Sequence, residues 1–276
     1  MNRIDLIKTI EQIDFGSETW EWLDLMETIA GELQKEAMIQ EKGFRADTPY
    51  KKYLLCAINK DLQTINATYF LLRCEMIHQA ASHVRLFCES LITMRYVAME
   101  RESRAAQFWG YMGIEAYKVT EALLELESPT ANPEHVLRMV KFKESIKPAH
   151  EKARPHYSYE DKKKRVRPFI NWCNKSVSVQ AQQCGKRYSR LYNSVYRQMS
   201  AYIHGSAWSL RRQLSYSRDH YDPRVVLIDI SSMIRTLAAV WVEWATFCCE
   251  ELGWRLQNTI IFVQETVSDL DNKHFG

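Results

Sequence analysis

The sequence predicts an all-α fold, arranged as a multi-helix antiparallel bundle with one very long central helix and an irregular basic loop. The chain of 276 residues has only 9 Gly and 7 Pro, so few positions interrupt a helix. Apolar residues recur at three- and four-residue intervals along most of its length, and no convincing strand pattern or internal repeat is found. We therefore expect a single helical domain over residues 1–276, with neighbouring helices antiparallel.

The bundle begins with an N-terminal helical arm, residues 1–48. A helix from Glu18 to about Lys42 is predicted by an apolar stripe comprising Trp22, Leu25, Met26, Ile29, Leu33 and Ala37. Gly43 and Pro49 then oppose its continuation. We expect the polypeptide to turn back at this point.

The very long helix dominates the next part of the chain, residues 49–152. It is predicted to run from about Tyr50 or Leu62 to Glu100, with an apolar stripe formed by Leu62, Ile65, Tyr69, Leu72, Met76, Ala80, Val84, Phe87, Leu91 and Met94. His78, Arg85 and Glu89 lie on the opposite face at 100° per residue. They form either a second polar cluster between packed helices or an ordinary exposed face with an Arg85/Glu89 pair.

The remaining elements follow from caps and breaks. We predict a helix over 105–127, a helix capped by Asn132 that runs to about Lys152, a helix over about 179–204, and a helix capped by Asp222 that ends near Leu252. Residues 153–180 are predicted to be the basic loop or a lid, and 181–276 to carry the functional site. Residues 258–267 allow either a strand or a last helical turn.

Positive charge is concentrated in one segment. Residues 153–220 hold 14 Lys and Arg against 3 Asp and Glu, a net charge of +11, whereas the whole chain carries only +3. Such a field attracts polyanions, and nucleic acid is the usual ligand. The alternative is a solvated basic loop, built around Lys162, Lys163, Lys164, Arg165 and Arg167.

A ridge of side chains lies in the same segment, with Tyr188, Tyr192, Tyr196, Ser200 and His204 at a strict four-residue interval before Gly205. On an α-helix this spacing gives one slowly drifting row. Arg197 lies about 20° around the helix from His204 and roughly 10 Å along it. The pattern predicts that a guanidinium, a hydroxyl and an imidazole share one surface. Alternatively, the tyrosines are core aromatics and His204 caps the helix end.

Arg197 and His204 also fit an Arg-x(4–6)-His pattern, which occurs twice in this chain. The second match is Arg73 and His78, which an unbroken helix would hold about 140° apart. Only Arg197 and His204 are therefore expected to cooperate within one helix.

The stretch Tyr192-x3-Tyr196-x3-Ser200-x3-His204-Gly205-Ser206 is preceded by Trp172 and Gly185 and by a helix that includes Arg85 to Leu91. Together these residues resemble an uncharacterised prokaryotic helical family of unknown function over roughly residues 60–250. That family is similar to the HEPN class, whose members are helical, commonly dimeric, and often act as metal-independent ribonucleases in toxin or antiviral systems. Gln198 follows Arg197, where active HEPN enzymes commonly have Asn, Asp or His.

The resemblance implies a metal-independent endoribonuclease that cleaves single-stranded RNA and acts as a homodimer, without a cofactor. His204 would move a proton, Arg197 would hold the phosphate, and Ser200 or Tyr196 would orient the imidazole. The expected substrate-binding residues are Lys163, Lys164, Arg165, Arg167, Trp172, Arg190 and Tyr192. An antitoxin or another defence-system protein is a possible partner. No set of His, Cys and carboxylates has the spacing of a metal site.

Two other functional classes remain open. One is a non-catalytic module that binds nucleic acid or a nucleotide through the same basic residues and tyrosines. The other is a scaffold or oligomerisation protein that uses the tryptophans Trp241, Trp244 and Trp254. A cytoplasmic location is expected, because seven scattered cysteines suggest reduced thiols and the longest nearly apolar run, Leu237 to Cys249, is too short to cross a bilayer.

Overall fold

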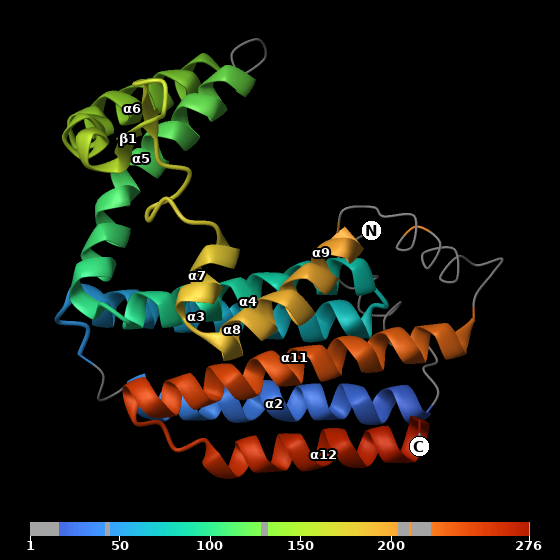
Figure 1. The fold of residues 1–276 in the computed structure, drawn as a ribbon. Coiled ribbons are helices and arrows are strands. Elements are labelled where there is room, and N and C mark those ends of the chain that lie inside the picture. The colour runs from blue at the N-terminus through green and yellow to red at the C-terminus, as the bar shows by residue number, and fades with distance from the viewer. Residues whose placement is uncertain (1–16, 42–44, 128–131, 204–209, 211–221, 276) are drawn as a thin grey trace.

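The structure is a computed structural model, which describes residues 17–41, 45–127, 132–203, 210 and 222–275 (Figure 1). The described part consists of helices and one two-stranded hairpin, so the predicted all-α multi-helix fold is confirmed. The main helices are α2 (Ser17–Glu41), α3 (Pro49–Arg73), α4 (Ile77–Ala98), α5 (Arg101–Glu127), α6 (Pro133–Ala153), α11 (Pro223–Leu252) and α12 (Gln257–Phe275).

The helices form layers around α4. Figure 1 shows α2 between α11 and α12 on one side, and the hairpin of α3 and α4 above them. On the other side of α4 lie four short elements, α7 (Val177–Gln183), α8 (Lys186–Leu191), the π-helical turn η2 (Tyr192–Tyr196) and α9 (Arg197–Ile203). The α5–α6 hairpin projects away from this bundle.

The helix starts agree with the predicted caps. The Asn132 side chain accepts a hydrogen bond from the amide of Glu134 at 3.0 Å, and Asp222 accepts one from Arg224 at 3.0 Å. Each is followed by a proline in the first turn, where a missing amide hydrogen costs nothing. Gly253 ends α11 in the left-handed conformation, with φ of 69°.

The single very long helix was the wrong prediction for residues 50–100. The chain instead folds back between α3 and α4, through a Schellman turn in which Glu75 adopts φ of 54°. The amide of Met76 bonds to the carbonyl of Leu71, and that of Glu75 to Leu72, which satisfies the last carbonyls of α3. The turn contains neither Gly nor Pro, and the apolar stripe continues across it. The sequence therefore gives no signal that the helix ends here.

Three other expectations are corrected. Residues 258–267 form neither a strand nor a final turn, because they lie within the long helix α12. The predicted loop 153–180 contains a short 3-10 helix (Arg154–Tyr157) and a hairpin of β1 (Ser158–Glu160) and β2 (Val166–Pro168). The predicted helix over 179–204 is interrupted at Gly185, whose φ of 101° ends α7, and again by η2.

The core lies between α2, α3, α4 and α11. The tryptophans Trp22, Trp241 and Trp244 are fully buried there, and Trp254 packs against Trp244 with 5.8 Å between ring centroids. Trp241, Trp244 and Trp254 therefore stabilise the interior of the chain, and the idea that they form an oligomer interface was wrong. The segment Arg224–Leu252 is apolar and long enough to span a membrane, yet 56% of its most apolar stretch is buried inside the fold, as in a core helix.

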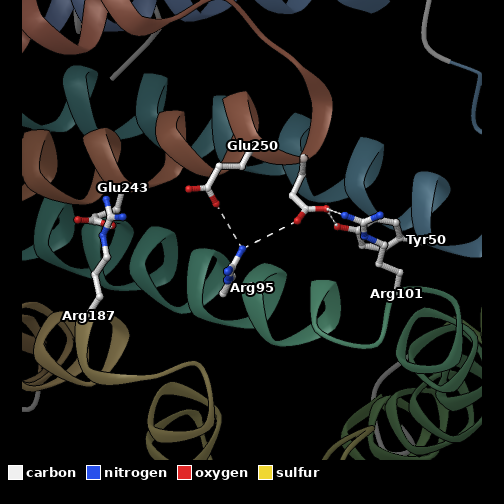
Figure 2. Close-up of polar contacts among 7 residues, drawn as sticks. Tyr50, Arg95, Arg101, Arg187, Glu243 and Glu250 are labelled. Atoms are coloured by element: carbon white, nitrogen blue, oxygen red, sulfur yellow. Dashed lines mark hydrogen bonds and ion pairs between the residues drawn. The ribbon is translucent and has the colours of Figure 1, made fainter.

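A polar network fixes the C-terminal part of α11 to the other helices (Figure 2). Arg95 of α4 reaches Glu250 at 3.4 Å, and Arg187 of α8 pairs with Glu243. Glu251 is the most enclosed acid of this network, since its side chain is only 9% exposed. It accepts a hydrogen bond from the Tyr50 hydroxyl at 2.9 Å and pairs with Arg101 at 3.0 Å.

Candidate functional site

The candidate site lies along the seam where α4 packs against η2 and α9. The Arg85 guanidinium of α4 donates a hydrogen bond to the Tyr196 hydroxyl at 2.8 Å, and its Cζ atom lies 4.7 Å from the centroid of the Tyr196 ring. Further along the seam, the His78 ring of α4 meets the Tyr202 ring of α9 edge to face, with 5.9 Å between the ring centroids. The seam therefore brings His78 and Arg85 of α4 against tyrosines of η2 and α9 that are far away in the sequence.

The backbone at the seam is a π-helical turn. The amide of Arg197 bonds to the carbonyl of Tyr192, five residues earlier, which widens the helix at this point. The Tyr192 and Tyr196 rings stack there, with centroids 4.9 Å apart and 19° between their planes. Single π turns inside α-helices occur frequently at functional sites.

The tyrosine ridge is therefore neither fully exposed nor fully buried. Tyr188 is 7% exposed, and burial raises the pKa of its phenol to about 12. Tyr192, Tyr196 and Ser200 are half-buried against the core. The Ser200 hydroxyl donates to the Tyr196 carbonyl at 2.7 Å, as Ser residues inside helices often do.

The pairing of Arg197 with His204 stays a prediction. Arg197 begins α9 and its side chain is exposed. His204 and Gly205 lie outside the described residues, which end on this helix at Ile203. Arg190, one helical segment earlier, is also exposed.

The second Arg-x(4–6)-His match is divided by the Schellman turn, so an unbroken helix does not set its geometry. Arg73 ends α3 and lies over the Trp20 ring of α2, 5.0 Å from its centroid. His78 lies in the first turn of α4 and faces Tyr202 of α9. Arg73 and His78 thus contact side chains of different helices.

Glu89 and Trp172 lie at a different place from the seam. Both line a cleft of about 400 Å³ between α3, α4, α5 and α7. Trp172 is 6% exposed and packs against Tyr96 and Phe108, with centroids 5.8 and 5.7 Å away. The structure thus places Trp172 largely in the core at the wall of this cleft, and Glu89 faces the same cleft while Arg85 contacts Tyr196 at the seam.

The basic loop forms the tip of the β1–β2 hairpin. Asp161 organises it: one carboxylate oxygen accepts from the amides of Lys163 and Arg165, and the other pairs with the side chains of Arg165 and Arg167. Lys163 and Lys164 are exposed beside it. In Figure 1 the hairpin lies along α5 and α6, on the far side of the molecule from α9, so these cations are not part of the seam.

Asp61 is a buried acid that the sequence pattern did not single out as a site residue. Its carboxylate accepts a hydrogen bond from the Trp244 indole at 2.9 Å, while the second oxygen has no partner among the described residues. Burial raises its pKa to about 7, although the hydrogen bond from Trp244 opposes this shift. The signal was available, because Asp61 lies three residues after Ile58 and four before Ile65, on the apolar face of α3.

All seven cysteines are free thiols, and Cys88, Cys173 and Cys248 are buried. Burial raises the pKa of the Cys184 thiol to about 11. Within the described ranges, no three His, Cys, Asp or Glu side chains converge in the way a metal ion requires.

A family model for a family of unknown function, DUF5677, matches residues 51–221. The chain belongs to the DUF5677 family. The matched region begins in α3 and includes α4, the π turn and α9, so it contains the whole seam. No curated protein and no solved structure matches the chain.

Proposed function

We propose that this DUF5677 protein is a HEPN-like, metal-independent endoribonuclease, a cytoplasmic toxin or effector of a prokaryotic defence or stress system that cleaves single-stranded RNA. The observation that carries the proposal is the Arg85–Tyr196 pair. This pair links α4 to the last residue of the π turn, directly before Arg197. His204 follows seven residues after Arg197 in the sequence.

The chemistry follows from the residue types. Cleavage of RNA without a metal needs a group that transfers a proton near neutral pH and a cation that stabilises charge on the transferring phosphate. His204 supplies the first function and exposed Arg197 the second. Attack of the ribose 2′-hydroxyl then expels the 5′-oxygen of the next nucleotide and leaves a cyclic phosphate.

Tyr196 is a positioning residue in this scheme. Its hydroxyl is held by Arg85 and its carbonyl by Ser200, so its backbone and ring are fixed directly before Arg197. Ser200 therefore supports the helix through Tyr196 rather than orienting the imidazole. A symmetric partner would bring a second histidine to complete the acid and base pair.

The test is cleavage of 5′-labelled single-stranded RNA in EDTA by the parent protein and by His204→Ala and Arg197→Ala. Loss of the proton-transfer group should slow cleavage by about a hundredfold or more. His156→Ala and Arg224→Ala, which change exposed residues outside the seam, are the matched controls. Equal rates in parent and His204→Ala would contradict the proposal.

A second candidate is a non-catalytic nucleic-acid-binding module. This candidate is favoured by the Ser200 hydroxyl. Its proton is already donated to the Tyr196 carbonyl, so the hydroxyl is not free to donate to a reacting group. A binding module would leave RNA intact, and Lys163→Ala or Arg190→Ala would weaken binding and reduce its dependence on salt.

A further inference from the structure

The α5–α6 hairpin leaves much of its apolar surface uncovered. It projects from the bundle in Figure 1, and none of the described residues of α6 is buried. Even so, α6 carries Leu137, Val140 and Phe142, which are all exposed. Exposed apolar surface of this extent on a soluble fold usually marks an interaction site.

The exposed residues of α5 follow a regular pattern. Met112, Val119, Leu123 and Leu126 are 61%, 58%, 43% and 77% exposed. Their spacing of seven, four and three residues is that of a coiled-coil seam, which expects a second helix against it. We call these four residues the α5 stripe.

A groove lies beside the α5 stripe. It has a volume of about 570 Å³ and is lined by Ala116, Val119, Thr120 and Leu123 from α5 and by His135, Arg138, Met139 and Phe142 from α6. One hairpin thus offers both an apolar ridge and an apolar groove, and Val119 and Leu123 form the edge between them. Ridges of one helix pack into the grooves between others.

We propose that the α5–α6 hairpin is a self-association surface, on which the α5 stripe of one copy lies in the α5–α6 groove of a second copy. A two-fold pair uses the same patch on both subunits, so each copy provides the ridge once and the groove once. The result is a four-helix bundle made of two hairpins. The hairpin projects away from the seam, so this contact is separate from any pairing of the two His204 helices, and the proposal does not depend on ribonuclease activity.

The charges of the hairpin favour a second copy as the occupant. Between Met112 and Leu126, α5 carries three glutamates and one lysine. Between Glu134 and Lys147, α6 carries four Lys and Arg against two glutamates. Glu121 and Lys143 already pair within one hairpin at 2.9 Å. Arg138 lines the groove and Glu115 lies one turn before Val119, so two-fold pairing brings these two charges together across the interface and helps to fix its register.

The test is sedimentation velocity over a range of concentrations. The full chain of 32.5 kDa should sediment as a dimer of about 65 kDa. Because it puts a charge in the centre of the interface, Val119→Glu should raise the dimer dissociation constant by about thirtyfold or more. Ile261→Glu, the same kind of change at an exposed residue of α12, should leave the constant unchanged.

A charge exchange separates this pairing from other occupants of the groove. Arg138→Glu, which reverses a charge that lines the groove, should weaken the dimer, and adding Glu115→Lys should restore it. Helix content by circular dichroism shows that each variant is folded. A monomer at all concentrations, or a dimer unaffected by Val119→Glu, would overturn the proposal.

Discussion

At the scale of single residues, the buried carboxyl of Asp61 makes stability depend on pH. Its pKa of about 7 in the fold is well above the ordinary value of 3.8, because burial disfavours the charged form. The folded state then holds a proton that the unfolded state has lost, so this contribution is complete below about pH 4 and is lost as pH rises through 7. The loss amounts to about 4 kcal/mol.

Asp61→Asn should remove this dependence. The amide keeps an acceptor for the Trp244 indole and carries no charge at any pH. Urea unfolding should show the variant to be more stable than the parent at pH 8, and similar to it at pH 4. A variant that loses the same stability as the parent between these pH values would show that other groups cause the effect.

Single residues also show where sequence reasoning stops. The periodicity of α4 correctly placed His78 and Arg85 away from the apolar stripe. It gave no information on their partners, because Tyr196 lies 111 residues further along the chain. The split of Glu89 from Arg85 likewise depends on which helices flank α4, which local spacing does not encode.

At the scale of elements, caps were predictable and the breaks without Gly or Pro were not. Asn132 and Asp222 mark helix starts through side chains whose chemistry is local. The turn at Glu75 is imposed by packing of α3 on α4, since the residue itself disfavours a positive φ. The sequence likewise gives no signal for the π turn after Leu191.

The β1–β2 hairpin gives a prediction at this scale. Asp161 holds the tip through two backbone amides and two arginines, and these contacts lower its pKa, the Arg165 amide most of all. Asp161→Ala should therefore speed hydrogen exchange of the Phe169 amide, which bonds to the Tyr157 carbonyl across the hairpin.

Glu160→Ala is the matched control for the hairpin, because it removes a neighbouring exposed carboxylate that does not organise the tip. Unchanged exchange at Phe169 in Asp161→Ala would mean that strand pairing alone maintains the hairpin. Since the pKa of Asp161 is lowered, its contribution should be present at neutral pH and fade as pH falls below about 4.

At the scale of the whole molecule, the acids of α11 hold the C-terminal helices to the N-terminal ones. Glu251→Ala should lower the free energy of unfolding by about 2 kcal/mol, because it removes the charged acceptor of the hydrogen bond from the Tyr50 hydroxyl. Glu250→Ala, one residue away, removes an acid that is 52% exposed and should cost less than about 1 kcal/mol. Thermal unfolding of the two variants compares them directly, and equal losses would contradict the difference in burial.

The position of α2 has a consequence for the synthesis of the chain. This helix contacts α3, α11 and α12, so part of its apolar stripe is covered by segments translated some two hundred residues later. Until those segments leave the ribosome, Trp22, Met26 and Ile29 lack much of their packing. We therefore expect the apolar stripe of α2 to stay partly exposed until the C-terminal helices have been synthesised.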